Sequence, residues 1–346
     1  MTQEAEVLFS RVGSAGLITL NRPKALNALT LNMVRLIHPQ LNEWARDPAI
    51  RLVMIEGAGE KGFCAGGDIR ALHDWGKAGA RDAYDFYREE YRLNTAIKRY
   101  PKPYVALMDG ITMGGGVGMS VHGSHRVATE RLVFAMPETG IGLIPDVGGT
   151  YFLPRLPGQI GMYLALTGER LKAADACHAG IADLFVEGHR LEALKIALGE
   201  GQNVDSVLVG FKSDPGEAPL KTQRAVIDRH FGGESVAAIL ASLKSDGSEW
   251  ALAMARLIEA KSPTCEIVAH RQLRLGARLS FEECMAVDFR LTSRCMQGHD
   301  FYEGVRAVII DKDQAPKWQP PTLAEVSGAS VDAYFETLGT EELKLS

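Results

Sequence analysis

The sequence predicts an α/β fold followed by a helical C-terminal part. Through about residue 190, short apolar runs rich in β-branched residues alternate with segments of helical periodicity, as in a sheet flanked by helices. Beyond that point, helical periodicities follow one another with hardly a strand between them. The 346 residues are 46% hydrophobic and 23% charged, which are the proportions of a globular protein with an ample core.

The first elements read as a hairpin, a helix and a strand. In residues 6–20, two β-rich runs are parted by Gly-Ser-Ala-Gly, which predicts a hairpin. Thr30 is placed to cap a helix, because apolar residues from Leu31 to Trp44 recur mostly at steps of three and four. The apolar run LVMIE at 52–56 predicts a buried strand.

The later elements continue this alternation and then become helical. Residues 81–99 predict a charged helix, 104–110 a buried strand and 125–136 two short strands. The polar, Gly- and Pro-containing residues 201–216 are the expected linker. The helical periodicities that follow it span residues 218–229, 234–244, 248–260, 264–276 and 280–296.

Composition excludes several classes of protein. Thirty-eight Lys+Arg against 43 Asp+Glu give a net charge of −5, so we expect neither a nucleic acid nor a membrane as partner. Five scattered cysteines and nine histidines without ligand spacing indicate reduced thiols and no metal site. The acidic, strand-like first residues resemble neither a signal nor a transit peptide, and no apolar run reaches the ~18 residues of a membrane span. These features predict a cytoplasmic protein.

Three familiar motifs are incomplete. Gly57 to Gly62 fits G-x-G-x-x-G after a strand, but no helix begins at the third glycine, which argues against a dinucleotide site. Ser120 lacks the final glycine of a nucleophile elbow and is expected inside a small-residue helix. Cys64 has no histidine in a recognisable motif, so we interpret it as a small buried hydrophobe.

Two Gly-rich segments each follow a predicted buried strand. They are residues 64–68, with the sequence CAGGD, and residues 114–118, with the sequence GGGVG. Small side chains let a ligand approach the backbone, and one N–H from each segment can form an oxyanion hole. The alternative interpretation is two ordinary Gly-rich turns.

Two carboxylates lie eight residues apart in a loop rich in glycine and proline. Glu138 and Asp146 are suited there to acid–base or nucleophilic work, because the surrounding backbone is constrained. The alternative is that Glu138 caps a turn and Asp146 caps a helix beginning at Val147. The residues alone leave both interpretations open.

Four motifs follow one another within about 140 residues: LNRPKALNALT (20–30), GFCAGGDI (62–69), DGITMGGGVG (109–118) and MPETGIGLIPDVGGTYFLPRL (136–156). In order and spacing they resemble the motifs of the enoyl-CoA hydratase/isomerase (crotonase) superfamily. The resemblance implies a spiral of ββα units over residues 1–200 and a helical part over 217–346 that covers the active site. Within that superfamily the chain is most similar to a hydrolase branch, through residues 84–94, 145–148 and 300–318.

The resemblance also implies catalytic roles. The backbone N–H groups of Gly67 and Gly115 fall where the family holds the thioester oxygen. Glu138 aligns with the general acid/base carboxylate, and Asp146 supplies a second carboxylate where hydratases commonly have glycine. Gly118 stands in the place of the second catalytic glutamate of typical hydratases, which weakens the hydratase interpretation.

The resemblance to the family further implies which residues bind the substrate. Glu90 falls where the hydrolase branch contacts the hydroxyl end of the acyl group, beside Gly115, Glu138 and Asp146. Neighbouring helical residues do not share a face, so only one of Glu89 and Glu90 can point inward, and a solvated face is the alternative for both. The residues aligned with the nucleotide and pantetheine contacts are Lys24, Leu26, Ala65, Gly67 and Asp68.

The implied reaction is hydrolysis of the thioester of 3-hydroxyisobutyryl-CoA, with related short 3-hydroxyacyl-CoAs as further substrates, to the free acid and CoA in valine catabolism. No cofactor is expected, because coenzyme A is part of the substrate. The alternatives are a hydratase that adds water to a 2-enoyl-CoA and a non-catalytic acyl-CoA-binding subunit. The oligomeric state stays open, a homo-oligomer included.

Overall fold

The computed structural model describes residues 5–345. The chain forms two compact units, each made of segments that are separate in the sequence, so neither unit coincides with the predicted segments 1–200 and 217–346. Within the described residues, the first unit consists of 5–68, Arg92–Phe134 and Arg170–Lys221, and the second of Ile69–Tyr91, Ala135–Glu169 and 222–345. That the helical part covers an active site stays a prediction.

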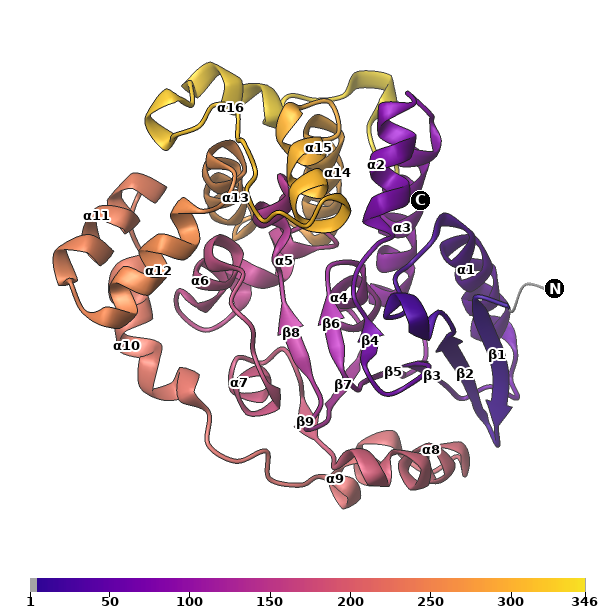
Figure 1. The fold of residues 1–346 in the computed structure, drawn as a ribbon. Helices are drawn as coiled ribbons and strands as arrows, with labels where there is room; N and C mark the ends of the chain where they lie inside the picture. The colour runs from indigo at the N-terminus through magenta and orange to yellow at the C-terminus, as the bar shows by residue number, and fades with distance from the viewer. Residues whose placement is uncertain (1–4, 346) are drawn as a thin grey trace. The chain divides into compact units, whose positions relative to one another are not determined.

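The first unit is built on a six-stranded sheet (Figure 1). Its first two strands form the predicted antiparallel hairpin, in which Val12 pairs with Ala15, and the remaining strands are parallel. The strands, in spatial order, are β1 (Val7–Val12), β2 (Ala15–Leu20), β3 (Leu52–Gly57), β5 (Tyr104–Met108), β7 (His125–Ala128) and β9 (Leu184–Phe185).

Three short strands make a second sheet, β4 (Gly62–Cys64), β6 (Ile111–Met113) and β8 (Val133–Ala135). Each follows a strand of the larger sheet directly, so the chain visits the two sheets in turn before a helix returns it. This order produces the spiral of ββα units that the resemblance implied, and it confirms the predicted α/β fold.

Helix α1 (Leu31–Arg46) begins where the sequence predicts. The Thr30 hydroxyl accepts a hydrogen bond from the Met33 amide at 3.0 Å, which is a typical N-cap. The other helices of this unit are α4 (Gly115–Ser120), α7 (Ala173–His178), α8 (Leu191–Gly199) and α9 (Val204–Phe211).

The expected linker at residues 201–216 is wrong, because α9 lies within it. Val204, Val207 and Leu208 are buried in the hydrophobic cluster that also covers one face of the larger sheet, and Asn203 caps the helix by accepting from the Ser206 amide. Packing of this short apolar stripe therefore outweighs the glycines that flank it.

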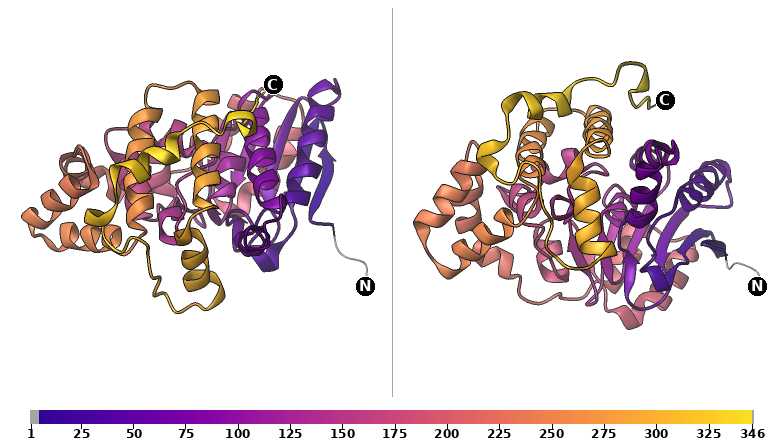
Figure 2. Two further views of the ribbon diagram at one scale, coloured as in Figure 1. Left: turned by 90° about the horizontal axis from the view of Figure 1, so that it is seen from above. Right: turned by 45° about the horizontal axis from the view of Figure 1, so that its top comes forward.

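The second unit is helical. No strand follows Phe185 in the part of the chain that the structure describes, which confirms the helical C-terminal part. Figure 2 shows α16 lying across α13 and α14. The main helices are α2 (Ile69–Lys77), α3 (Asp82–Lys98, through Tyr91), α5 (Gly149–Phe152), α6 (Ile160–Thr167), α10 (Pro219–Phe231), α11 (Val236–Asp246), α12 (Glu249–Glu259), α13 (Pro263–Gly276), α14 (Phe281–Cys295), α15 (His299–Val305) and α16 (Gly328–Phe335).

Candidate functional site

Three of the predicted carboxyl groups are buried in the second unit. Glu90, Glu138 and Asp146 expose only 2%, 5% and 4% of their surface. Burial, and then the charge of Asp146, raise the pKa of Glu90 and of Glu138 well above the usual value for a glutamate. Burial raises the pKa of Asp146 to about 6. Such shifts are typical of acid–base sites.

Asp146 is oriented by a tyrosine that the sequence analysis did not single out. The Tyr91 hydroxyl, on α3, donates a hydrogen bond to Oδ2 of Asp146 at 2.5 Å. Burial keeps the pKa of Tyr91 well above its usual value, so Tyr91 stays a donor. This bond lowers the pKa of Asp146 and partly offsets the effect of its burial.

The turn that carries Asp146 has an unusual backbone. Val147 has φ +49° and Gly148 has φ +87°, and a positive φ is costly for a β-branched residue such as valine. Helix α5 begins after Gly148, and no side chain caps it. The interpretation of Asp146 as a helix cap is therefore wrong, because its side chain binds Tyr91 instead.

Two buried side chains from distant helices hold this turn in place. Gln272 of α13 donates to the Pro145 carbonyl at 2.7 Å. Asp288 of α14 accepts from the Gly148 amide at 2.7 Å and from the Thr150 hydroxyl. Burial raises the pKa of Asp288 to about 8. No sequence motif marks Gln272 or Asp288, because their partners lie more than 100 residues away.

Glu138 begins a single 3-10 turn, η2 (Glu138–Ile141), that no side chain caps. Its Oε2 atom is buried and has no hydrogen-bond partner in the protein. The charge of Lys261 lowers the pKa of Glu138, although burial outweighs this effect. The structure therefore gives no support to Glu138 as a turn cap.

The structure shows which of the two neighbouring glutamates on α3 points into the protein. Glu90 is buried and its Oε1 atom has no hydrogen-bond partner, whereas Glu89, its neighbour on α3, is half-buried. Glu90 is therefore the inward-facing residue of the pair, and a solvated face is wrong for it.

The residues aligned with coenzyme A contacts lie together in the first unit. The Ala65 amide donates to the Leu26 carbonyl at 3.0 Å, and Asp68 accepts from Arg22 at 2.9 Å. Lys24 is exposed on the 3-10 turn η1 (Pro23–Ala25), which lies between Arg22 and Leu26 in the sequence. The structure therefore brings the turn before α1 and the loop after β4 together.

Both predicted oxyanion donors are also in the first unit. Leu29 pairs with the Gly66 carbonyl and the Asp68 amide, so the N–H of Gly67 points to the opposite side. Gly115 is the first residue of α4, where an amide has no partner within its helix. A Cβ on Gly66 would lie 3.8 Å from the Gly115 nitrogen, so the two Gly-rich segments adjoin each other.

The incomplete motifs are structural. The chain leaves β3 at Gly57 and enters β4 at Gly62, without the helix that a dinucleotide site requires. Ser120 lies inside α4, where its hydroxyl donates to the Gly116 carbonyl at 2.8 Å, and Cys64 is fully buried. Among residues 5–345 no cluster of His, Cys, Asp and Glu could hold a metal ion. No helix in the same range is long and apolar enough to cross a membrane.

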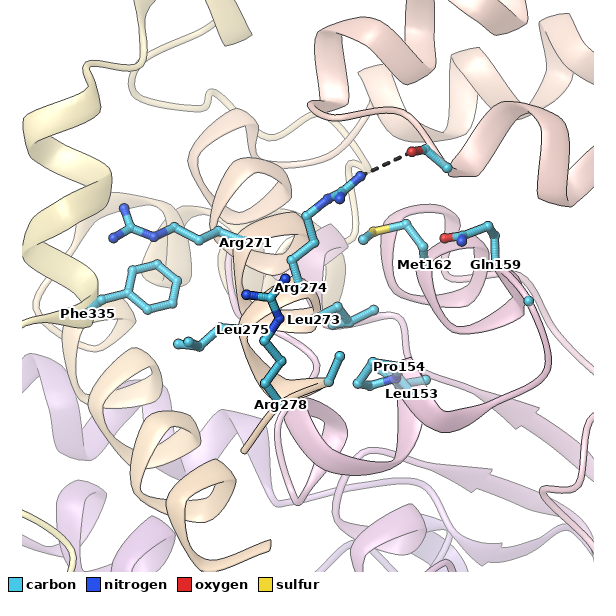
Figure 3. A pocket seen from close by; sticks show the side chains of 13 residues that line it. Leu153, Pro154, Gln159, Met162, Arg271, Leu273, Arg274, Leu275, Arg278 and Phe335 are labelled. Atoms are coloured by element: carbon cyan, nitrogen blue, oxygen red, sulfur yellow. Dashed lines mark hydrogen bonds between the residues drawn. The ribbon is translucent and has the colours of Figure 1, made fainter. Parts of the chain in front are cut away.

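A pocket of about 630 Å³ lies elsewhere on the second unit, beside α13 (Figure 3). Two of its three arginines are engaged by the protein: Arg274 donates to the Gly232 and Gly233 carbonyls, and Arg271 pairs with Asp332. None of the predicted catalytic or substrate-binding residues lines it. This pocket is therefore distinct from the buried carboxyl groups.

Comparison with known proteins identifies the family. The family model described as enoyl-CoA hydratase/isomerase matches residues 15–335. The chain belongs to this family. Solved structures share its fold over nearly the whole chain. A carnitinyl-CoA dehydratase from Mycobacterium thermoresistibile has a TM-score of 0.94 and 43% identity, with 99% of both chains covered. An enoyl-CoA hydratase from Rhodobacter sphaeroides has a TM-score of 0.93 and 41% identity, with 99% of this chain and 100% of that chain covered.

Among the family members with similar sequences are two named 3-hydroxyisobutyryl-CoA hydrolase, mitochondrial. The protein from Danio rerio is 54% identical, over 99% of this chain and 92% of its own. The human protein is 49% identical, over 98% of this chain and 90% of its own. Their names contradict the predicted cytoplasmic location. Reduced cysteines indicate a reducing environment, but they do not identify the compartment.

Proposed function

We propose that the protein hydrolyses the thioester of 3-hydroxyisobutyryl-CoA to the free hydroxy acid and CoA, as a step of valine catabolism. The observation that carries the proposal is the group of buried carboxyls, Glu90, Glu138 and Asp146, in which Glu90 and Glu138 each have an unpartnered oxygen. A buried polar atom without a partner costs about 1–3 kcal/mol, which a bound ligand would recover. Relatives with 49–54% identity carry the name of this hydrolase.

In this reaction a water oxygen replaces the sulfur on the carbonyl carbon. Glu138 either removes a proton from the attacking water or attacks the carbonyl itself, which expels CoA thiolate and leaves a mixed anhydride for water to hydrolyse. Its raised pKa makes its ionised form a stronger base. Asp146 would orient the water or return a proton to the thiolate. No cofactor takes part in either route.

The amides of Gly67 and Gly115 would donate to the thioester oxygen as negative charge builds on it. Loss of one such donor typically costs about 2.7–4 kcal/mol of transition-state stabilisation. Lys24, Leu26, Ala65 and Asp68, close together around the turn before α1, would hold the nucleotide and pantetheine.

Glu138→Gln is expected to abolish hydrolysis and leave binding of the ester nearly intact, because it keeps the shape and removes only the base or nucleophile. The release of free thiol measures turnover, and calorimetry with the ester measures binding. A variant that keeps a tenth or more of kcat would contradict the role of Glu138.

The two routes differ in where the water oxygen goes. In a single turnover in H₂¹⁸O with excess enzyme, the anhydride route can place ¹⁸O in the Glu138 carboxylate, whereas the general-base route places it only in the product acid. Mass spectrometry of the peptide that contains Glu138 separates them.

The second candidate is hydration of a 2-enoyl-CoA, because the two solved structures above carry hydratase or dehydratase names. Against it, Gly118 on α4 has no side-chain carboxyl at the position where the family resemblance places the second catalytic glutamate of hydratases. Crotonyl-CoA decides between them: loss of the enoyl absorbance supports the hydratase, and thiol release from the hydroxyacyl ester supports the hydrolase. If neither signal is observed, the result favours a binding subunit.

A further inference from the structure

Tyr87 presents a second unpartnered polar group on the same face of α3 as Glu90. Its side chain is 2% exposed, and its hydroxyl has no hydrogen-bond partner in the protein. Tyr87 and Glu90 are three residues apart in a helix, so their side chains are neighbours. Two buried polar atoms without partners on one turn of a helix require an explanation.

The surroundings of Tyr87 connect it to the buried carboxyl groups. Its ring lies 5.9 Å from the ring of Tyr91, whose hydroxyl holds Asp146. The charges of Asp146, Glu90 and Glu138 all act on the Tyr87 hydroxyl, and with burial they raise its pKa well above the usual value. Tyr87 therefore keeps its proton and can donate a hydrogen bond.

An alcohol both donates and accepts hydrogen bonds, so a buried alcohol needs an acceptor and a donor beside it. Glu90 supplies an acceptor and Tyr87 a donor, each with one atom unpartnered. We propose that Tyr87 donates a hydrogen bond to the 3-hydroxyl oxygen of the acyl group while Glu90 accepts the hydroxyl proton. Tyr87 is then a specificity-determining residue for hydroxyacyl thioesters. This inference rests on the proposed function and extends it.

The test compares two esters that differ only in the 3-hydroxyl, 3-hydroxyisobutyryl-CoA and isobutyryl-CoA. Tyr87→Phe is expected to lower kcat/KM for the hydroxylated ester by at least about tenfold and to leave isobutyryl-CoA unchanged. The matched control is Tyr84→Phe, which removes a hydroxyl from a half-buried tyrosine on the same helix and is expected to change neither ester.

Two further measurements separate this role from a structural one. The thermal midpoint of Tyr87→Phe is expected to equal or exceed that of the wild type, because the lost hydroxyl had no partner. Tyr87→Phe combined with Glu90→Gln is expected to lose less than the product of the two single effects, because both residues bind one hydroxyl.

Each contrary result has one meaning. If Tyr87→Phe slows both esters equally, Tyr87 serves the common chemistry and the inference is wrong. If it slows neither ester, or if it lowers the thermal midpoint by several degrees together with both rates, the inference is also wrong. If the wild type releases no thiol from either ester, the proposed function itself fails.

Discussion

One hydrogen bond adjusts the ionisation of Asp146. Burial makes the charged form of this carboxyl unfavourable, and the Tyr91 hydroxyl at 2.5 Å compensates in part by donating to it. With a pKa of about 6, Asp146 is mostly ionised at neutral pH yet can still carry a proton. A group that both accepts and returns protons near neutrality suits acid–base work on a thioester.

Tyr91→Phe is expected to move the acidic limb of the pH–rate profile to higher pH. A donor stabilises the charged form of its acceptor, so its loss raises the pKa of Asp146, and hydrogen bonds to charged groups are worth about 1.5–3 kcal/mol, or roughly one to two pH units. The measurement is kcat from thiol release between pH 5 and 9. An unchanged midpoint together with a lower plateau would mean that Tyr91 acts only on packing.

At the scale of elements, α13 and α14 shape the turn that carries Asp146. Besides the bonds from Gln272 and Asp288, the backbone of α13 packs against α5, the helix that follows the turn: a Cβ on Gly276 would lie 1.9 Å from the Thr150 carbonyl oxygen. The positive φ of Val147 persists because contacts on both sides fix the backbone. Helices late in the chain thus position a carboxyl that belongs to a central loop.

The same substitution is therefore expected to have opposite effects at two helical glycines. Gly276→Ala should destabilise the protein by about 1–3 kcal/mol through overpacking against Thr150, and should lower kcat by displacing the turn. Gly210→Ala in α9, where a Cβ meets nothing within 4 Å, should stabilise it by about 0.5–1 kcal/mol with unchanged kcat. Urea unfolding and thiol release measure both variants, and equal effects at the two sites would contradict this role of α13.

Local patterns explain which elements could be predicted. Thr30 and the apolar stripe after it define α1, whereas the three-residue strand β4 (Gly62–Cys64) is too short to show a period. In the site, Glu138 and Asp146 gain a catalytic interpretation only from the resemblance to the family, because a carboxylate in a Gly- and Pro-rich loop is equally well explained as a turn or helix cap. The contact between Asp288 and Gly148 spans 140 residues, and nothing in the sequence near either residue encodes it.

At the scale of the whole molecule, buried carboxyls couple folding to pH. Asp288 and Asp146 have pKa values raised by burial to about 8 and about 6, and burial raises the pKa of Glu90, Glu138 and Glu266 well above the usual range. In the unfolded chain these groups ionise near pH 4. Between about pH 4 and 8 the folded protein therefore binds more protons than the unfolded chain, and its stability falls as pH rises.

Asp288→Asn isolates one part of this effect, since asparagine keeps the shape of the side chain but cannot ionise. The wild type should lose stability relative to the variant as pH rises from 5 to 8, by at most about 1.4 kcal/mol per pH unit for this one carboxyl, and no further above its folded pKa. The lowered pKa of buried His270 acts in the opposite direction but is common to both proteins, so it cancels in the difference. Urea unfolding at four pH values between 5.5 and 8.5 gives that difference, and Asp214→Asn, the same substitution at an exposed site, is measured beside it as the control. If the difference in unfolding free energy between the wild type and Asp288→Asn does not change with pH, Asp288 is ionised throughout this range. Folding would then be accompanied by no proton uptake at Asp288, and the prediction would be wrong.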